Sequence, residues 1–545
     1  MKSNHLRDEE IKNGKQMQSI YRPALSLALI LLGQQLAICQ TSATRPNIVF
    51  VLADDMGWNQ PGFNGGKNDL TPNLNQLASE GMRLAEFYTH SVCAPTRAAF
   101  LTGRYAFRTW SDWRSEDFGK PSYLAKLGLE LAKNDRGEET RRIHALDTHE
   151  RTIAEALQEA GYYTGLLGKW HLGEWLPEHL PMGQGFDYQY GHYAWGIDYY
   201  NKTIVHNAPA RFAVYDWHRN QQPVNESGYA TDLIAKEAEK FLADRKESND
   251  QKTLQPFFLY VAFNAVHGPL NPPPEFNGDP DDPLQIRNAM LASLDKAVGQ
   301  ISKAVDDNGF RNSTLFIFTN DNGPVLEEMS RPYRGTKNTT FEGGVRQPAI
   351  LRWPGHTKPG TIKPGKMFIA DFFPTFITLA GGSHQQERQV DGIDMTSMLF
   401  EGGESNRDEI VFDVAGSVRL PTIRMGDFKL MGDALYDLKK DPFEKLDVAT
   451  NYPDVVRQLS QRLTEIGEQR PPLGDKPLLM DPPLPFVYGL GEQKQVPAWL
   501  IESVNQVRSN QPKDWAPGET PWPKAPKGAV ASKMDGLKDE SGGSK

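Results

Sequence analysis

The sequence predicts an α/β fold: a large mixed, mostly parallel β-sheet sandwiched by helices, followed by a smaller C-terminal α+β subdomain. Short apolar, β-branched runs recur along the 545-residue chain, and stretches of helical periodicity separate them. Such alternation is typical of parallel sheets whose strands are buried on both faces and connected by helices. From about Ile410 the apolar runs become shorter and rich in turns, which predicts a short antiparallel sheet.

The predicted buried strands of the main sheet end in polar residues. These strands span 47–52, 162–167, 256–263, 314–319 and 348–353. The first is followed by Asp54-Asp55 and the fourth by Asn320-Asp321-Asn322. Acidic residues at the carboxyl ends of buried strands lie where open α/β sheets place their sites, although each pair alone could equally form a solvated turn.

Apolar spacing and capping residues predict the helices between these strands. Their expected ranges are 72–80, 95–101, 123–131, 152–160, 286–305, 371–380 and 453–463. The helix at 123–131 falls in a charged stretch, 110–148, which we interpret as a surface insertion without assigned function.

Charge and the N-terminal segment limit the function classes. With 60 basic and 69 acidic residues the formal charge is −9, which argues against a general nucleic-acid binder. Arg22 precedes an apolar run, 23–32, of the length of a signal-peptide core and short for a bilayer span. Met17 is a possible true start, and Thr41-Ser42-Ala43 offers small residues for cleavage. We therefore expect export to the periplasm or medium, or to the lysosome in a eukaryote, with no membrane span.

The two cysteines lead to one residue of special interest. Cleavage near Ala43 removes Cys39, so the mature chain would hold Cys93 alone and form no internal disulfide. Cys93 begins Cys-Ala-Pro-Thr-Arg and would lie just before a helix N-terminus, which favours an anion. Arg97 adds a planar cationic donor about one turn later. Chemical conversion of the thiol would explain a single cysteine in an exported protein.

Three further segments carry basic residues near predicted strand ends. Lys169 and His171 lie two apart in Gly-Lys-Trp-His-Leu-Gly, so both can point to one side of a strand end. His267 precedes Gly-Pro after a buried strand, and Lys337 lies shortly before Phe-Glu-Gly-Gly. Taken singly, each could be a surface lysine or a structural histidine.

The residue types at the acidic strand ends predict a metal site. Asp54, Asp55, Asp321 and Asn322 offer hard oxygen donors, which favour Ca²⁺ or Mg²⁺ over Zn²⁺. Calcium is the better fit, because a site built wholly from protein groups suits its larger and looser coordination shell.

Together these motifs resemble the type I sulfatases, formylglycine-dependent enzymes of the alkaline-phosphatase-like superfamily. The resemblance runs from about Arg45 to Tyr452. It departs at Thr96, where serine is common, at 338–340, and in the N-terminal extension. The pattern of Phe186-Asp187, a Gly-rich gap and Asp198-Tyr199-Tyr200 is most similar to the arylsulfatase B (N-acetylgalactosamine-4-sulfatase) branch.

The resemblance implies a role for each residue singled out above. A maturation enzyme would oxidise Cys93 to formylglycine, and the modified side chain would join Asp54, Asp55, Asp321 and Asn322 as a metal ligand. The hydrated aldehyde would attack sulfur, while Lys337 and His267 contact the sulfate and one of them protonates the leaving oxygen. His171 would take a proton from the second hydroxyl, and Lys169 and Arg97 would hold the hydrate and a sulfate oxygen.

Substrate and alternatives stay open at this stage. The aromatic stretch 191–200 suits stacking on sugar rings but is equally typical of plain packing, so the substrate is expected to be a sulfated carbohydrate or an aryl sulfate. One alternative is a formylglycine-dependent phosphodiesterase or phosphonate monoester hydrolase on the same fold. Another is a non-catalytic protein that binds sulfated glycans through an unmodified Cys93.

The expected organisation follows from these observations. We assign 1–43 to the signal peptide, 44–405 to the catalytic domain and 406–470 to the small C-terminal subdomain. Residues 471–522 form a Pro-rich extension, and the Lys/Gly/Ser-rich tail 523–545 is expected to be disordered.

Overall fold

A computed structural model describes most of the chain beyond the N-terminal segment. The described residues are 45–67, 69–109, 129–133, 139–143, 145–174, 177–206, 212–250, 255–415, 417, 419–471, 478–479 and 497–509. The chain divides into two compact units, Met1–Arg45 and Pro46–Lys545, and the elements described below belong to the second unit. The predicted signal peptide, the Pro-rich extension apart from its described pieces, and the predicted disordered tail lie outside the described residues.

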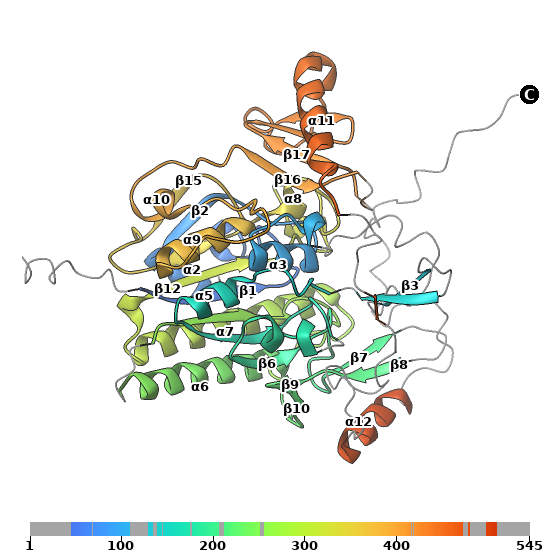
Figure 1. The fold of residues 1–545 in the computed structure, drawn as a ribbon. Helices are drawn as coiled ribbons and strands as arrows, with labels where there is room; N and C mark the ends of the chain where they lie inside the picture. Colours follow the sequence, from blue (N-terminus) through green and yellow to red (C-terminus); the bar gives the residue numbers. More distant parts are fainter. Residues whose placement is uncertain are drawn as a thin grey trace, which may run out of the picture. The chain divides into compact units, whose positions relative to one another are not determined.

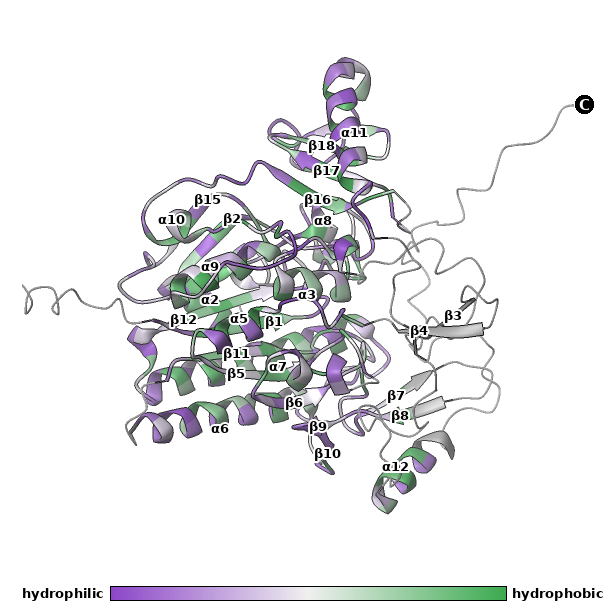
Figure 2. Ribbon diagram, viewed as in Figure 1, coloured by the Kyte–Doolittle hydropathy of each residue, from purple (hydrophilic) through white to green (hydrophobic). Residues whose placement is uncertain are grey.

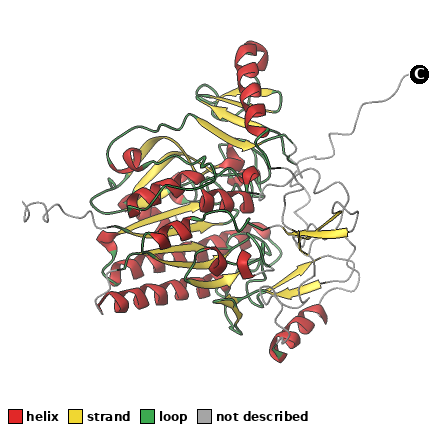
Figure 3. Cartoon of the chain, in the orientation of Figure 1, coloured by secondary structure: helices red, strands yellow, loops and turns green. Residues whose placement is uncertain are grey.

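The main sheet has eleven strands and is parallel at its centre (Figures 1 and 3). Its order is β10 (Gln222–Pro223), β9 (His218–Arg219), β6 (Tyr188–His192), β5 (Tyr163–Lys169), β11 (Phe257–Ala262), β1 (Asn47–Ala53), β12 (Thr314–Asn320), β14 (Ile350–Arg352), β2 (Met82–Tyr88) and β13 (Arg346–Gln347), with β15 (Thr361–Phe368) also paired to β2. The five strands from β6 to β12 pair in parallel, whereas β14 joins β12 in antiparallel fashion. The predicted fold class is therefore confirmed.

Two hydrophobic cores cover the two faces of this sheet. Along β1, Phe50 belongs to one core and Val51 to the other, as expected when successive side chains alternate between faces. The first core contains α3 (Cys93–Thr102), α5 (Ile153–Glu159) and α9 (Phe372–Ala380), and the second contains α2 (Pro72–Glu80), α6 (Ala230–Asp250) and α7 (Pro283–Asp307). Figure 2 shows α6 and α7 alternating between hydrophobic and hydrophilic residues, as expected of helices with one buried face.

Helix α3 is fixed against the centre of the sheet by aromatic packing. Phe100 of α3 stacks on Phe50 of β1 with ring centroids 4.1 Å apart, and Phe372 of α9 meets Phe50 edge-on at 5.1 Å. Gly103 caps the C-terminus of the helix, and its φ of 68° is the left-handed conformation typical of a glycine cap. This packing fixes the position of α3, and with it the helix N-terminus, relative to β1.

A four-stranded antiparallel sheet follows the main sheet in the chain. It consists of β16 (Glu409–Asp413), β17 (Thr422–Met425), β18 (Phe428–Met431) and β19 (Ala434–Asp437), and α11 (Pro453–Gly467) follows. Lys429 of β18 is fully buried between Glu342 and Glu444, with Nζ 3.1 Å and 2.8 Å from their carboxylates. Glu342 begins α8 (Glu342–Val345), so this cluster connects the small sheet to the main one.

Several sequence predictions need correction. Leu129–Lys133 is a strand, β3, paired with β4 (Glu139–Ile143), so the predicted helix is wrong over 129–131; its earlier part lies outside the described residues. Helix α3 begins at Cys93, which is therefore its first residue and does not precede the helix. The 21-residue α6 and α12 (Ala498–Ser509) were not predicted. Among the described helices, none is long and apolar enough to cross a bilayer.

Candidate active site

The candidate site lies where four neighbouring parallel strands end in register. Leu52 of β1 pairs with Ala262 of β11 and Thr319 of β12, and Ala262 pairs with Gly168 of β5. The residues just beyond this row therefore meet at one edge of the sheet. They include Asp54, Asp55, Lys169, Asn264, Asp321 and Asn322, and the N-terminus of α3 joins them there.

Asp54 is fully buried, and two basic side chains donate hydrogen bonds to one of its carboxylate oxygens. Its Oδ2 accepts hydrogen bonds from Lys169 Nζ at 2.5 Å and Arg97 Nη2 at 3.0 Å. Its Oδ1 lies 3.4 Å from Cys93 Sγ. These cations hold the pKa of Asp54 well below its usual range, despite the opposing effect of burial. Asp54 is therefore an ionised carboxylate that faces the cysteine.

Asp55 gathers a second set of partners. Lys337 Nζ lies 2.7 Å from Asp55 Oδ1, and Asn322 Nδ2 donates to the same oxygen at 2.7 Å. His267 Nε2 lies 3.8 Å from Asp55 Oδ2. The pKa of Asp55 is lowered, since Lys337 and His267 outweigh burial. Lys337 and His267 thus both contact the Asp55 carboxylate, which follows the end of β1.

Arg97 connects the carboxylates of the two acidic strand ends. Besides Asp54, its Nη2 donates to Asp321 Oδ2 at 2.8 Å, and its Nη1 donates to the Lys169 carbonyl at 3.0 Å. The guanidinium is fully buried, so its charge is balanced within the site. Arg97 therefore has a direct structural part in holding the strand ends together.

Cys93 lies between an acidic and a basic group. Its side chain is nearly fully buried, and Lys337 Nζ and Asp54 Oδ1 each lie 3.4 Å from Sγ. Burial and the carboxylates of Asp321 and Asp54 raise the pKa of the Cys93 thiol far above its usual value. An unmodified Cys93 would stay protonated and be a poor nucleophile at neutral pH.

The two histidines are both neutral near pH 7. Burial and the charge of Lys337 lower the pKa of His267 to about 4. Burial, Lys169 and Arg97 lower the pKa of His171 well below its usual value. His171 Nδ1 is buried and has no hydrogen-bond partner among the described residues. A neutral imidazole with a free nitrogen has the form that a general base needs.

Backbone geometry marks the same site. Outside glycine, left-handed φ values are rare, and Asp55 and His171 each have φ of 60° while Asn338, next to Lys337, has 70°. Such conformations tend to gather where the surrounding structure fixes side chains for function. Three of the seven non-glycine residues with such φ values in the described part of the chain thus lie in or next to the predicted site segments.

The residues present fit a divalent cation. Asn322 Oδ1 is buried without a hydrogen-bond partner among the described residues, while its Nδ2 is used by Asp55. Burial and the charge of Asp54 raise the pKa of Asp321 to about 6, because the charges of Arg97 and Lys169 only partly offset them. Ligand atoms of Asp54, Asp55, Cys93 and His267 all lie within 4.8 Å of one another. This group includes His267 and not Asp321. An orphaned amide oxygen on Asn322, whose Nδ2 donates to Asp55, suits a hard cation such as Ca²⁺.

The structure brings all ten sequence-predicted site residues to this edge of the sheet, although their catalytic and metal-binding roles stay predictions. It also changes the interpretation of the aromatic stretch 191–200. Tyr193 and Tyr199 are fully buried and serve packing, whereas Trp195 is half-buried with its ring 5.8 Å from that of His267. Aromatic density was its only sequence signal, and nothing in the sequence singled out Trp195.

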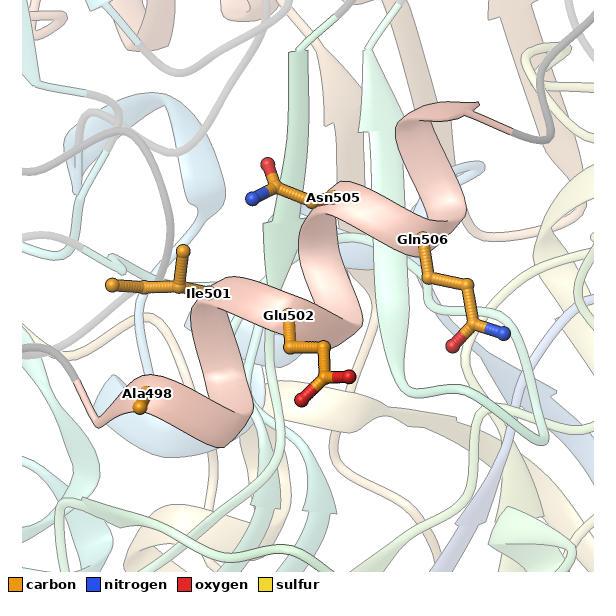
Figure 4. A pocket seen from close by; sticks show the side chains of 5 residues that line it. All are labelled: Ala498, Ile501, Glu502, Asn505 and Gln506. Carbon is orange, nitrogen blue, oxygen red and sulfur yellow. The ribbon is translucent and has the colours of Figure 1, made fainter.

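A surface hollow lies away from these residues. One face of α12 lines it, through Ala498, Ile501, Glu502, Asn505 and Gln506 (Figure 4). None of the candidate site residues lines this hollow, and it is mostly open to solvent. The hollow therefore adds nothing to the site at the sheet edge.

Comparisons with known proteins agree with this geometry. The Sulfatase family model matches residues 46–383. Arylsulfatase G of Rattus norvegicus is 32% identical over 438 residues, which cover 72% of this chain and 76% of that protein. N-acetylgalactosamine-6-sulfatase of Mus musculus is 32% identical over 405 residues, covering 70% and 71%. These relatives indicate the family without singling out the arylsulfatase B branch.

A solved structure shares the fold. The crystal structure of Ps i-CgsB in complex with k-i-k-neocarrahexaose is 27% identical, with a TM-score of 0.65. The match covers 78% of this chain and 94% of that one. The similarity therefore extends over nearly the whole of the solved chain.

Proposed function

The chain belongs to the sulfatase family, whose members hydrolyse sulfate esters, and on that premise we propose that it cleaves a sulfated carbohydrate through a formylglycine made from Cys93. The observation that carries the proposal is the position of Cys93 Sγ between the Asp54 carboxylate and the Lys337 ammonium, each at 3.4 Å. Relatives support the carbohydrate class: one is an N-acetylgalactosamine-6-sulfatase, and another was crystallised with k-i-k-neocarrahexaose.

A divalent cation, which we propose to be Ca²⁺ with Mg²⁺ the weaker candidate, would supply positive charge next to the sulfate oxygens. Asp54, Asp55, Asp321, Asn322 and the modified Cys93 would hold it. The orphaned Asn322 Oδ1 and the crowded carboxylates support this assignment. Formylglycine, when hydrated, supplies two hydroxyl groups, one to attack sulfur and one to expel sulfate, which neither a serine nor a thiol can do.

The side chains of this chain would divide the remaining work. Lys169 and Arg97 already hold Asp54 and place two fixed cations beside residue 93, where a sulfate oxygen needs them. Lys337 or His267 would give a proton to the leaving sugar oxygen as the sulfur–oxygen bond breaks. His171, neutral with a free Nδ1, would accept the proton of the second hydroxyl.

Export belongs to this proposal as well. The apolar run 23–32 after Arg22 supports a signal peptide, and a secreted or periplasmic enzyme would meet extracellular sulfated polysaccharides directly. A formylglycine-generating enzyme is then the maturation partner that the chain requires.

The proposal is tested by assaying protein co-expressed with a formylglycine-generating enzyme. We expect sulfate release from one or more galactose, glucose or N-acetylgalactosamine monosulfates and from nitrocatechol sulfate, with Ca²⁺ present. Cys93→Ala removes the thiol without introducing a charge. It should lose this turnover by about 10⁴-fold or more while keeping its melting temperature.

Other outcomes would favour the alternatives. Faster turnover of bis(nitrophenyl) phosphate than of every sulfate ester would indicate a phosphodiesterase. Tight binding of sulfated glycans by protein with an intact Cys93 thiol, without turnover of any ester, would indicate a binding protein.

A further inference from the structure

Trp195 lies beside the candidate catalytic groups. It follows β6, and its ring meets the His267 ring at an angle of 61° with centroids 5.8 Å apart. His267 Nε2 in turn lies 3.8 Å from Asp55 Oδ2. The His267 imidazole therefore lies between the indole and the carboxylates of the site. Trp195 is half-buried, whereas its neighbours Ala194 and Gly196 are buried.

The backbone around Trp195 is held tightly to the segment that carries His267. The Tyr199 hydroxyl lies 2.7 Å from the Asn264 carbonyl and 2.8 Å from the His267 carbonyl. A Cβ atom on Gly196 would lie 3.3 Å from the Gly268 carbonyl oxygen, so the two segments are in close contact. Tyr199 N also donates to Asn271 Oδ1 at 3.1 Å. The indole is thus presented from a fixed backbone.

The other aromatic residues of this loop are either buried or bonded to the backbone of a neighbouring segment. Tyr193 stacks on His218 and Tyr199 on Tyr229, and both are fully buried. Tyr200 is exposed, but its hydroxyl donates to the Pro272 carbonyl at 2.7 Å. Among the aromatic residues of the 193–200 loop, Trp195 combines partial exposure with a ring contact to the candidate catalytic residue His267.

We infer that Trp195 is a specificity-determining residue, whose indole supports the sugar ring that bears the sulfate ester. The inference rests on the proposed function and deepens it. A pyranose has an apolar face of C–H groups that packs on an indole, and a rigid aromatic wall is what fixes the orientation of such a ligand. Sulfate itself would contact the cation cluster of Arg97, Lys169 and Lys337, one side chain away.

The test separates sugar recognition from support of His267. Steady-state kinetics would be measured for wild type, Trp195→Ala and Trp195→Phe on the sulfated hexose that wild type hydrolyses best. We expect KM to rise about tenfold in the alanine variant, with most of this loss restored by phenylalanine. Tyr200→Phe, in the same loop but without its hydroxyl bond to Pro272, is the matched control and should keep the wild-type KM.

Two readouts report on the chemistry alone. The kcat for nitrocatechol sulfate and the inhibition constant of inorganic sulfate should both stay within about twofold of wild type in Trp195→Ala, because neither depends on a sugar contact. Equal losses in these readouts and in hexose turnover would overturn the inference and assign Trp195 a structural role next to His267. An unchanged hexose KM in Trp195→Ala would overturn it as well.

Failure of the inference and failure of the proposed function look different. Wild-type turnover of nitrocatechol sulfate without turnover of any sulfated hexose would overturn the Trp195 assignment and leave a formylglycine sulfatase of another substrate class. Absence of turnover on every sulfate ester by protein with a confirmed aldehyde at residue 93 would overturn both.

Discussion

Lys337 Nζ lies 3.4 Å from Cys93 Sγ, although the two residues are 244 positions apart in the chain. Cys93 begins a helix fixed by aromatic packing on β1, and Lys337 lies in a loop whose backbone N–H donates to the Pro324 carbonyl at 2.8 Å. The ammonium also contacts Asp55 at 2.7 Å, so its position is set from two sides. A fixed cation at this point would lie next to a sulfate ester that residue 93 attacks.

The first prediction concerns the proton donor to the leaving oxygen. Despite burial, Asp55 and Cys93 raise the pKa of Lys337, so its ammonium carries a proton to give. Burial lowers the pKa of His267 to about 4, so its ring is neutral. We therefore expect Lys337 to be the donor. Lys337→Met should then lower kcat/KM for a sulfated hexose by about 10²-fold more than for nitrocatechol sulfate, whose phenolic leaving group needs less protonation. His267→Gln should lower both by similar factors. The reverse pattern in the two variants would assign the proton to His267.

The second prediction concerns the metal. Removing divalent cations with a chelator should abolish activity and lower the melting temperature, because a ligand that binds the folded state stabilises it. Ca²⁺ should restore both more effectively than Mg²⁺. Asn322→Leu should weaken Ca²⁺ binding measured by calorimetry, whereas Asn451→Leu, on an exposed asparagine, should not. Full activity after exhaustive chelation would contradict the site.

The third prediction concerns acid stability and His90. Its Nδ1 bonds the Phe412 carbonyl at 2.9 Å and Ala106 N donates to its Nε2 at 3.4 Å, so the neutral ring is satisfied on both sides. Burial lowers the pKa of His90 to about 3, from an ordinary value of 6.5. Between these values the unfolded chain binds a proton that the folded protein does not. His90 therefore favours unfolding increasingly as the pH falls below 6.5.

The size of this effect can be measured by urea denaturation. Between about pH 7 and pH 4, His90 should cost the wild type about 3 kcal/mol of unfolding free energy. His90→Gln carries no titrating group there and should lose correspondingly less stability over the same range. Parallel pH profiles for the two proteins would contradict the assignment.

The fourth prediction concerns the buried Lys429 cluster. Lys429→Met would leave Glu342 and Glu444 buried without their ammonium partner, which should cost about 3–5 kcal/mol of unfolding free energy. Lys439→Met is the matched control, since that lysine is 75% exposed and pairs with Asp427 at 3.5 Å. The control should change stability by less than about 0.5 kcal/mol. Similar losses of unfolding free energy in both variants would show that the buried cluster stabilises the protein no more than an exposed ion pair does.

The acidic half of the site could be predicted because strand ends share an edge. The apolar runs before Asp54 and Asp321 are unambiguous strands, and β1 and β12 pair in parallel over their full length. Residues that follow parallel neighbours in register must meet. The sequence predicted only that Lys169 lies at a strand end. The structure places it beside Asp54, because β5 ends in the same row through β11.

Other features depended on long-range packing that periodicity does not encode. Residues Leu129–Lys133 alternate in a way that fits a helix or a strand, and pairing with β4 decides for the strand. Helix α6, in contrast, could have been predicted, because its buried residues Ala230, Ile234, Ala238 and Phe241 recur at helical spacing in the sequence. Trp195 resembled its packed aromatic neighbours in sequence, and its contact with His267 follows from a loop held by Tyr199 hydrogen bonds.

The formylglycine mechanism is tested most directly by mass spectrometry of the peptide that contains Cys93, from active protein purified from its native host. We expect the mass of an aldehyde or its hydrate at residue 93, in proportion to specific activity. An intact Cys93 thiol in fully active protein would contradict this mechanism, because the buried thiol between Asp54 and Lys337 would then perform a reaction for which it has one nucleophilic group and a strongly raised pKa.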